Sequence, residues 1–136
     1  MTIPPFTGGK VTRVRDYSEH ILTAIGRIEA YVHGLNLPAF EQNTLIQDAV
    51  IRNFEIIGEA ANKIRLADPD LTQRSPHLKL DLAYRMRNAL IHGYDSVNLG
   101  TIWNTIRGDL PIPKRQIDDL LRQLPGGSDP ETASSP

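Results

Sequence analysis

Apolar residues recur at steps of three and four along most of the chain, which is the spacing of amphipathic helices. We expect the first helix to begin near Asp16 or Ser18, because both residue types suit a helix N-terminus, and to stop at the His33-Gly34 pair. Its apolar positions are Tyr17, Ile21, Ala24, Ile25, Ile28 and Val32.

The second helical segment is longer and more apolar. We expect it to run from about Phe40 to Ala67, after a link that contains Leu37 and Pro38. It ends at Asp68-Pro69-Asp70, since proline disfavours helical geometry in the residue before it. Its apolar positions are Leu45, Ile46, Ala49, Val50, Phe54, Ile56, Ile57, Ala60, Ala61 and Ile64. This set is wider than a single stripe, so the helix is expected to be central and packed on two sides.

Shorter helical faces follow. The pattern predicts a third helix over residues 78–90, ended by Gly93, and a fourth that begins with Asn98 as its N-cap. Pro111 and Pro113 interrupt the fourth helix before a last short helical face. The inward positions are Leu80, Ala83, Met86 and Leu90, then Leu99, Ile102, Trp103 and Ile106, then Ile117, Leu120, Leu121 and Leu124. Strand alternation, heptads and repeats are absent, so the fold class is all-α.

The chain has 136 residues, the length of a single domain. We divide it into an N-terminal arm (1–12), a helical domain (13–124) and a flexible tail (125–136) that is rich in Gly, Ser and Pro. No stretch resembles a signal peptide or the ~18 apolar residues of a spanning helix. We therefore expect a cytoplasmic protein without a membrane partner.

Composition and charge exclude several classes of function. There are no cysteines, which excludes disulfide scaffolds, thiolate zinc sites and cysteine nucleophiles. The net charge of −1 argues against a protein that coats nucleic acid through bulk charge. Residues 71–124 are nevertheless biased towards Lys and Arg, a bias that suits either an RNA-binding face or ordinary solvated surface.

Three of the four histidines, His20, His33 and His77, lie among ordinary neighbours, and we interpret them as surface or capping residues. No two histidines have the spacing of ligands on one helical turn, so we expect neither a metal site nor a cofactor. His92 differs because Arg87 precedes it and Tyr94 follows it. On a regular helix Arg87 and His92 would lie about 140° apart. An uncoiled last turn at His92-Gly93, or a symmetric partner, could bring the two side chains to one cleft.

These residue types suit RNA cleavage. The reaction needs a base for the 2′-hydroxyl proton and an acid for the leaving 5′-oxygen, and histidine, with an ordinary pKa of about 6.5, can serve as either. The guanidinium of Arg87 would bind the phosphate oxygens, and Tyr94 would stack on a base or donate to a phosphate. The structural alternative makes His92 a helix C-cap, Arg87 a solvated charge and Tyr94 a core anchor.

The pattern of Arg87, four residues, His92, one residue and Tyr94 resembles the motif of the HEPN domains, in particular their HepT-like toxin branch. Asn88 supplies the polar residue that this family has after the arginine, which favours Arg87 over Arg85. Residues 52–60 resemble the family's second helix, and residues 95–111, with Trp103, resemble its fourth. The resemblance covers roughly residues 13–124.

The resemblance implies an up-and-down bundle of four to five helices that forms a homodimer, with the two motifs in one cleft. It implies metal-independent cleavage of mRNA or tRNA, with Arg87 and His92 as catalytic residues. It also implies a toxin whose partner is a nucleotidyltransferase antitoxin of the MntA type. That partner would transfer AMP from ATP to Tyr94, which positions RNA, and so block the site.

Arg52 and Glu59 are seven residues apart and so share a helical face, which makes them, with Asn88, candidate supporting residues of the site. The alternative is a simple intrahelical pair of Arg52 with Glu55. Two other functions stay open. One is a non-catalytic module that binds nucleotide or presents substrate to a nucleotidyltransferase, and the other is a purely structural helical dimer.

Overall fold

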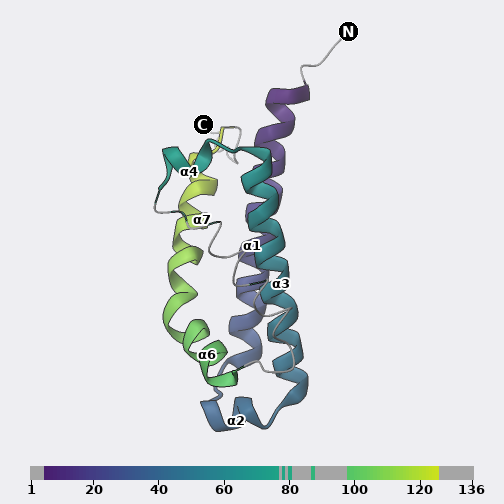
Figure 1. Ribbon diagram of the computed structural model, residues 1–136, viewed down its shortest axis with the longest axis vertical. Coiled ribbons are helices and arrows are strands. Elements are labelled where there is room, and N and C mark those ends of the chain that lie inside the picture. Colours follow the sequence, from purple (N-terminus) through teal and green to yellow (C-terminus); the bar gives the residue numbers. More distant parts are fainter. Residues whose placement is uncertain (1–4, 77, 79, 81–86, 88–97, 126–136) are drawn as a thin grey trace, which may run out of the picture.

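The computed structural model describes residues 5–76, 78, 80, 87 and 98–125, and these residues form helices joined by short turns, with no strand among them (Figure 1). In chain order the elements are α1 (Pro5–Val32), α2 (Leu37–Glu41), α3 (Thr44–Ala67), α4 (Leu71–Arg74), α6 (Leu99–Asn104), the π-helical turn η2 (Thr105–Asp109) and α7 (Pro111–Gln123). The all-α prediction is confirmed. Most of the predicted third helix, 78–90, lies outside the described residues, as does the tail beyond residue 125.

The helices run along the long axis of the molecule in columns formed by α1, by α3 and by the α6–η2–α7 segment (Figure 1). The chain descends through α1, turns at α2 and returns through α3, so that α1 and α3 are antiparallel neighbours. The α6–η2–α7 segment forms a further column that packs against α1. Among the described elements, α1 therefore contacts both of the other columns. The expectation that α3 is central also involves the predicted third helix, most of which lies outside the described residues, and stays a prediction. None of the helices in the described part of the chain is long and apolar enough to cross a membrane.

Helix α1 begins at Pro5, so the expected start near Asp16 or Ser18 was wrong, and residues 5–12 of the expected arm are helical. The missed signal is Val14, which is buried one turn before the first apolar position that we counted on this helix. The expected end is confirmed. The helix stops at Val32, and Gly34 adopts a φ of 77°, a left-handed conformation that glycine tolerates best.

The start of the second helix was also wrong, because two helices replace the single one expected. Asn36 caps α2, its side chain accepting a hydrogen bond from the Ala39 N–H, and Pro38 stands in the first turn. Asn43 then caps α3 by accepting from the Ile46 N–H at 3.0 Å. Asparagine at an N-cap satisfies a backbone donor that the helix leaves unpaired. The predicted end at Ala67 is confirmed.

The predicted N-cap at Asn98 is confirmed, since its side chain accepts from the Thr101 N–H at 3.0 Å. The two prolines interrupt the helix only locally. The Leu110 N–H donates to the Thr105 carbonyl five residues back, which is the hydrogen bond of a π-turn. Pro111 and Pro113 then fall in the first turn of α7, where a missing N–H removes no intrahelical bond.

The core runs along the inner faces of all these helices. Its fully enclosed side chains include Ile25 and Ile28 of α1, Val50 and Ile64 of α3, and Ile117 of α7. At the end of the bundle near α2, Phe40 packs against Trp103 with 5.3 Å between ring centroids. One residue of the expected core was wrong. Leu45 lies in the first turn of α3, outside this packing, and is 80% exposed.

Candidate functional site

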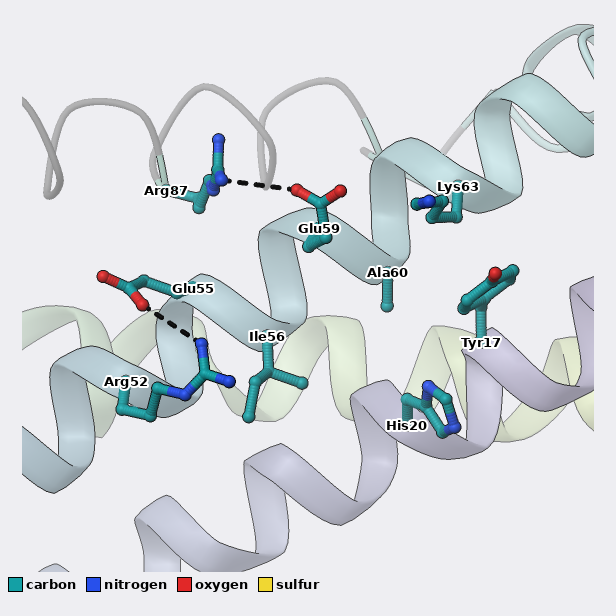
Figure 2. A pocket seen from close by; sticks show the side chains of 9 residues that line it. All are labelled: Tyr17, His20, Arg52, Glu55, Ile56, Glu59, Ala60, Lys63 and Arg87. Carbon is teal, nitrogen blue, oxygen red and sulfur yellow. Dashed lines mark hydrogen bonds and ion pairs between the residues drawn. The ribbon is translucent and has the colours of Figure 1, made fainter.

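A pocket of about 320 Å³ lies between α1 and α3 (Figure 2). Its lining among the described residues consists of Tyr17 and His20 from α1, Arg52, Glu55, Ile56, Glu59, Ala60 and Lys63 from α3, and Arg87. Most of these side chains are polar or charged, although the pocket sits directly beside the buried α1–α3 contact. A concave site with converging polar groups is the usual setting for ligand binding.

Helix α3 presents four charged side chains to the pocket because of their spacing. Arg52, Glu55, Glu59 and Lys63 follow one another at steps of three, four and four residues, which keeps them on one helical face. Between them, Ile56 and Ala60 provide the apolar part of the lining. The other core residues of α3 occupy different positions and only Ala60 belongs to both sets among the described residues, so the same helix serves both the core and the pocket.

Helix α1 supplies an aromatic pair. Tyr17 and His20 are three residues apart, on one face of α1. Their ring centroids are 5.6 Å apart and their planes stand at 86°, an edge-to-face contact. Tyr17 is half-buried and packs against the core, whereas His20 is exposed. Packing on the core therefore holds the Tyr17 ring in place at the pocket, and the His20 imidazole lies at the solvent-exposed edge of the pocket.

Arg87 reaches the pocket from the segment that follows α4 and forms an ion pair with Glu59, with 3.4 Å between Nη2 and Oε1 (Figure 2). The Arg87 side chain is only 26% exposed, whereas Glu59 is about half exposed. A planar guanidinium held by a carboxylate has a defined orientation, which suits it to contact an anion in the pocket. Because the acid is solvated, the pair itself contributes little to stability.

Arg52 forms an ion pair with Glu55 one turn further along α3, with 3.3 Å between Nη1 and Oε1. The alternative interpretation of Arg52, as part of an intrahelical pair with Glu55, is thus confirmed. Arg52 is largely exposed, so this pair adds at most a few tenths of a kcal/mol, about 0.3–0.5. Arg52 and Glu59 nevertheless line the same pocket, as their seven-residue spacing predicted.

Charge in the pocket is unevenly compensated. Among the described lining residues, three cationic side chains face two carboxylates, and each carboxylate is paired with an arginine. Within the described segments, Lys63 takes part in no ion pair or hydrogen bond, so the described lining is cationic at that end. Nor do the described residues contain three carboxylate or imidazole side chains grouped closely enough to hold a metal ion.

Of the residues singled out from the sequence, the structure brings Arg87, Glu59 and Arg52 to one pocket. His92, Tyr94 and Asn88 lie outside the described residues, and so does His77. The catalytic and supporting roles of all six site residues therefore stay predictions.

Sequence reasoning missed Tyr17, His20, Glu55 and Lys63 as pocket residues. Tyr17 had been placed on the inward face of its helix and His20 among the ordinary surface histidines. The missed signal was the charged stripe of α3, which continues the spacing of Arg52 and Glu59 by one further turn to Lys63.

The amino-acid sequence is similar to those of known proteins. The family model described as Ribonuclease HepT-like matches residues 21–120. A probable ribonuclease HepT of Thermococcus cleftensis is 35% identical over 108 residues, which are 79% of this chain and 96% of that protein.

Two proteins of Methanocaldococcus jannaschii are also similar. One, described as "gamma-glutamylcyclotransferase and putative RNase", is 33% identical over 111 residues, which are 82% of this chain but 49% of that protein. The chain thus spans about half the length of this relative. The other is described as a "putative RNase" and is 30% identical over 111 residues, 82% of this chain and 93% of that protein. No solved structure matches the chain.

Proposed function

The chain belongs to the HepT-like ribonuclease family, and from this premise we propose that it is a metal-independent endoribonuclease that cleaves cytoplasmic mRNA or tRNA as the toxin of a toxin–antitoxin pair. The observation that carries the proposal is the position of Arg87. This residue belongs to the motif, lies within the region that the family model matches, and stands at the wall of the pocket in contact with Glu59.

The proposed reaction is a transesterification. The 2′-oxygen of a ribose attacks the adjacent phosphorus, the bond from phosphorus to the 5′-oxygen breaks, and the products are a 2′,3′-cyclic phosphate and a 5′-hydroxyl. His92 moves the protons, taking one from the 2′-hydroxyl or returning one to the leaving 5′-oxygen. Arg87 donates to the non-bridging oxygens, whose negative charge grows in the transition state.

A homodimer is part of the proposal because one imidazole cannot easily serve both sides of a phosphodiester. A two-fold axis brings the same patch in twice, so a dimer would place two copies of His92 and of Arg87 around one substrate phosphate. The substrate would then bind in a cleft to which each protomer contributes one pocket.

The proposed regulation acts on Tyr94. A nucleotidyltransferase antitoxin of the MntA type would catalyse attack of the Tyr94 phenol oxygen on the α-phosphorus of ATP. A bond forms between that oxygen and phosphorus, pyrophosphate leaves, and the phenol proton is lost. The attached AMP brings a phosphate and a base to the place where RNA must bind, so it blocks cleavage.

The test is incubation of the purified chain with total tRNA and with mRNA, alone and after treatment with the antitoxin and ATP. The wild-type chain should cut RNA, and Arg87→Ala and His92→Ala should abolish cutting. Matched exposed residues outside the pocket, Arg115 and His33, serve as controls, and Arg115→Ala and His33→Ala should cut normally. Equal cleavage by the His92→Ala variant would end the catalytic assignment.

Treatment with antitoxin and ATP should add AMP to the wild-type chain, measured by mass spectrometry, and not to Tyr94→Phe. A wild-type chain that leaves tRNA and mRNA intact at every dose, while still binding nucleotide or antitoxin, would replace the enzyme by the non-catalytic binding module.

A further inference from the structure

The two ends of the pocket differ in chemistry (Figure 2). Arg52 and Glu55, which neutralise each other, lie at one end, and the pair of Arg87 with Glu59 lies in the middle. At the other end the described part of the lining consists of Lys63 from α3 with the aromatic pair of α1. A cation beside two aromatic rings is the combination that proteins use to bind single-stranded nucleic acid.

Lys63 is the cation whose charge the described lining does not compensate. It is exposed, and it lies one helical turn beyond Glu59, a rise of about 6 Å along α3. Lys63 thus lies beyond the Arg87–Glu59 pair along α3, on the side of the aromatic pair. A second phosphate of the same strand could therefore meet Lys63 while the first meets Arg87. A lysine binds phosphate as a point charge and needs no fixed geometry to do so.

The aromatic pair is suited to a base rather than to a phosphate. Tyr17 is anchored by its packing on the core, and the edge-to-face contact leaves Tyr17 and His20 at right angles. A flat base can stack one of its faces on either the Tyr17 or the His20 ring. Ala60 also lines the pocket, and its small side chain leaves room beside Tyr17.

The size of the pocket limits the ligand. At about 320 Å³ it lies at the lower limit of small-molecule sites, which run from roughly 300 to 1,000 Å³. This size suits a ligand as small as one nucleotide. Bases that are paired in a duplex also present no face to an aromatic ring, which is why proteins read single-stranded loops in this way.

We propose that Tyr17, His20 and Lys63 form a subsite for one unpaired nucleotide next to the phosphodiester that Arg87 contacts, so that the protein takes its RNA as a single strand or loop. This inference rests on the proposed function for the identity of the ligand. Tyr17 and His20 hold the base, and Lys63 holds the neighbouring phosphate.

The test is binding of a short 2′-O-methyl RNA of mixed sequence, presented as a single strand and as a duplex, followed by fluorescence anisotropy. The modification removes the attacking hydroxyl, so binding is measured without cleavage. The wild-type chain should bind the single strand more tightly than the duplex. Loss of stacking in Tyr17→Leu should weaken single-strand binding by about 5- to 150-fold, the equivalent of about 1–3 kcal/mol, whereas Tyr17→Phe should retain it.

The two other positions give independent readouts that do not disturb the core, because both side chains are exposed. Lys63→Gln should reduce the slope of log K against log salt by about 0.7, the loss of one phosphate contact to a single strand. His20→Ala should weaken single-strand binding and leave the salt slope unchanged. Arg115→Gln and His33→Ala, which remove a matching cation and imidazole outside the pocket, should behave as the wild type.

The outcomes separate this inference from the proposed function. If the wild-type chain cleaves RNA, yet Tyr17→Leu, His20→Ala and Lys63→Gln bind and cleave like their controls, the subsite is refuted and the ribonuclease stands. Equal affinity for strand and duplex also refutes it. If the wild-type chain cleaves nothing but the three variants lose single-strand binding, the subsite stands and the proposed activity fails. Circular dichroism of each variant checks that the helical fold is intact.

Discussion

Asp68 joins three helices through a single buried carboxylate. It ends α3, and its side chain is 8% exposed. Arg74 of α4 donates to it from Nη2 to Oδ2 and from Nη1 to Oδ1 at 3.4 Å, and Lys10 of α1 lies 3.7 Å from Oδ1. The hydrogen bond from Arg74 is the largest cause that holds the pKa of the Asp68 carboxyl below 3.8. We therefore predict that Asp68→Asn destabilises the fold through loss of this charge.

The magnitude follows from burial and from the partners. A hydrogen bond to a charged group contributes about 1.5–3 kcal/mol. Arg74 and Lys10 are each about half exposed, so both recover part of their hydration when the carboxylate is lost, and the asparagine oxygen still accepts a hydrogen bond. We expect Asp68→Asn to lower the free energy of unfolding at pH 7 by about 1–2 kcal/mol, or the Tm by roughly 3–8 °C for a chain of this size.

The sign of the pH dependence follows from the lowered pKa. The unfolded chain takes up the Asp68 proton near the ordinary value of 3.8, and the folded chain only at lower pH. The stabilisation is thus complete well above pH 3.8 and is lost as the pH falls through the folded pKa. The difference between wild type and Asp68→Asn should therefore be constant from neutral pH to about pH 5 and shrink below it.

Urea unfolding followed by circular dichroism at pH 7, 5 and 3 measures this difference. The matched control is Asp16→Asn, an exposed carboxylate on α1 without an ion pair in the described part of the chain, which should change the free energy of unfolding by less than about 0.5 kcal/mol. A difference that is as large at pH 3 as at pH 7 would show that packing, and not charge, explains the effect.

Three further predictions concern the core, a helix cap and the site. Phe40→Ala should lower the free energy of unfolding by about 3–5 kcal/mol, because a fully enclosed ring that packs against Trp103 is lost; a cost below 1 kcal/mol in urea unfolding would contradict the packing. Asn43→Ala should cost about 1 kcal/mol through loss of the α3 cap, and an unchanged midpoint would contradict the cap. Glu59→Gln should lower kcat for RNA cleavage several-fold, because Arg87 loses its orienting carboxylate. Binding of the 2′-O-methyl strand should stay equal or tighten. An unchanged kcat would show that Glu59 plays no part in the site.

The sequence was informative wherever structure depends on neighbours along the chain. Apolar periodicity predicted the helices and most of their buried faces, Asn98 predicted a cap, and Gly34 and Pro69 predicted ends. The errors also have local causes. The start of α1 was missed because the apolar positions counted for this helix began at Tyr17 and left out Val14. The break before Asn43 was missed because asparagine caps, rather than a change in apolar spacing, mark it.

The candidate site was predictable only in part. The motif pointed to Arg87 because it is a local pattern of residue types, and the spacing on α3 pointed to Arg52 and Glu59 because residues seven apart share a helical face. Tyr17 and Lys63 could not be connected in this way, since they are far apart in sequence and meet only because α1 packs antiparallel to α3.

The amino-acid sequence alone determines that this protein is helical, where most of its helices end and which faces are apolar, because hydrogen bonding and side-chain direction within a helix repeat every few residues. Only the tertiary structure decides that α1 contacts both other columns, that Glu59 pairs with Arg87, and that Lys63 lines the same pocket as Tyr17 and His20. Those contacts join residues distant in sequence, and their geometry depends on how whole helices pack against one another.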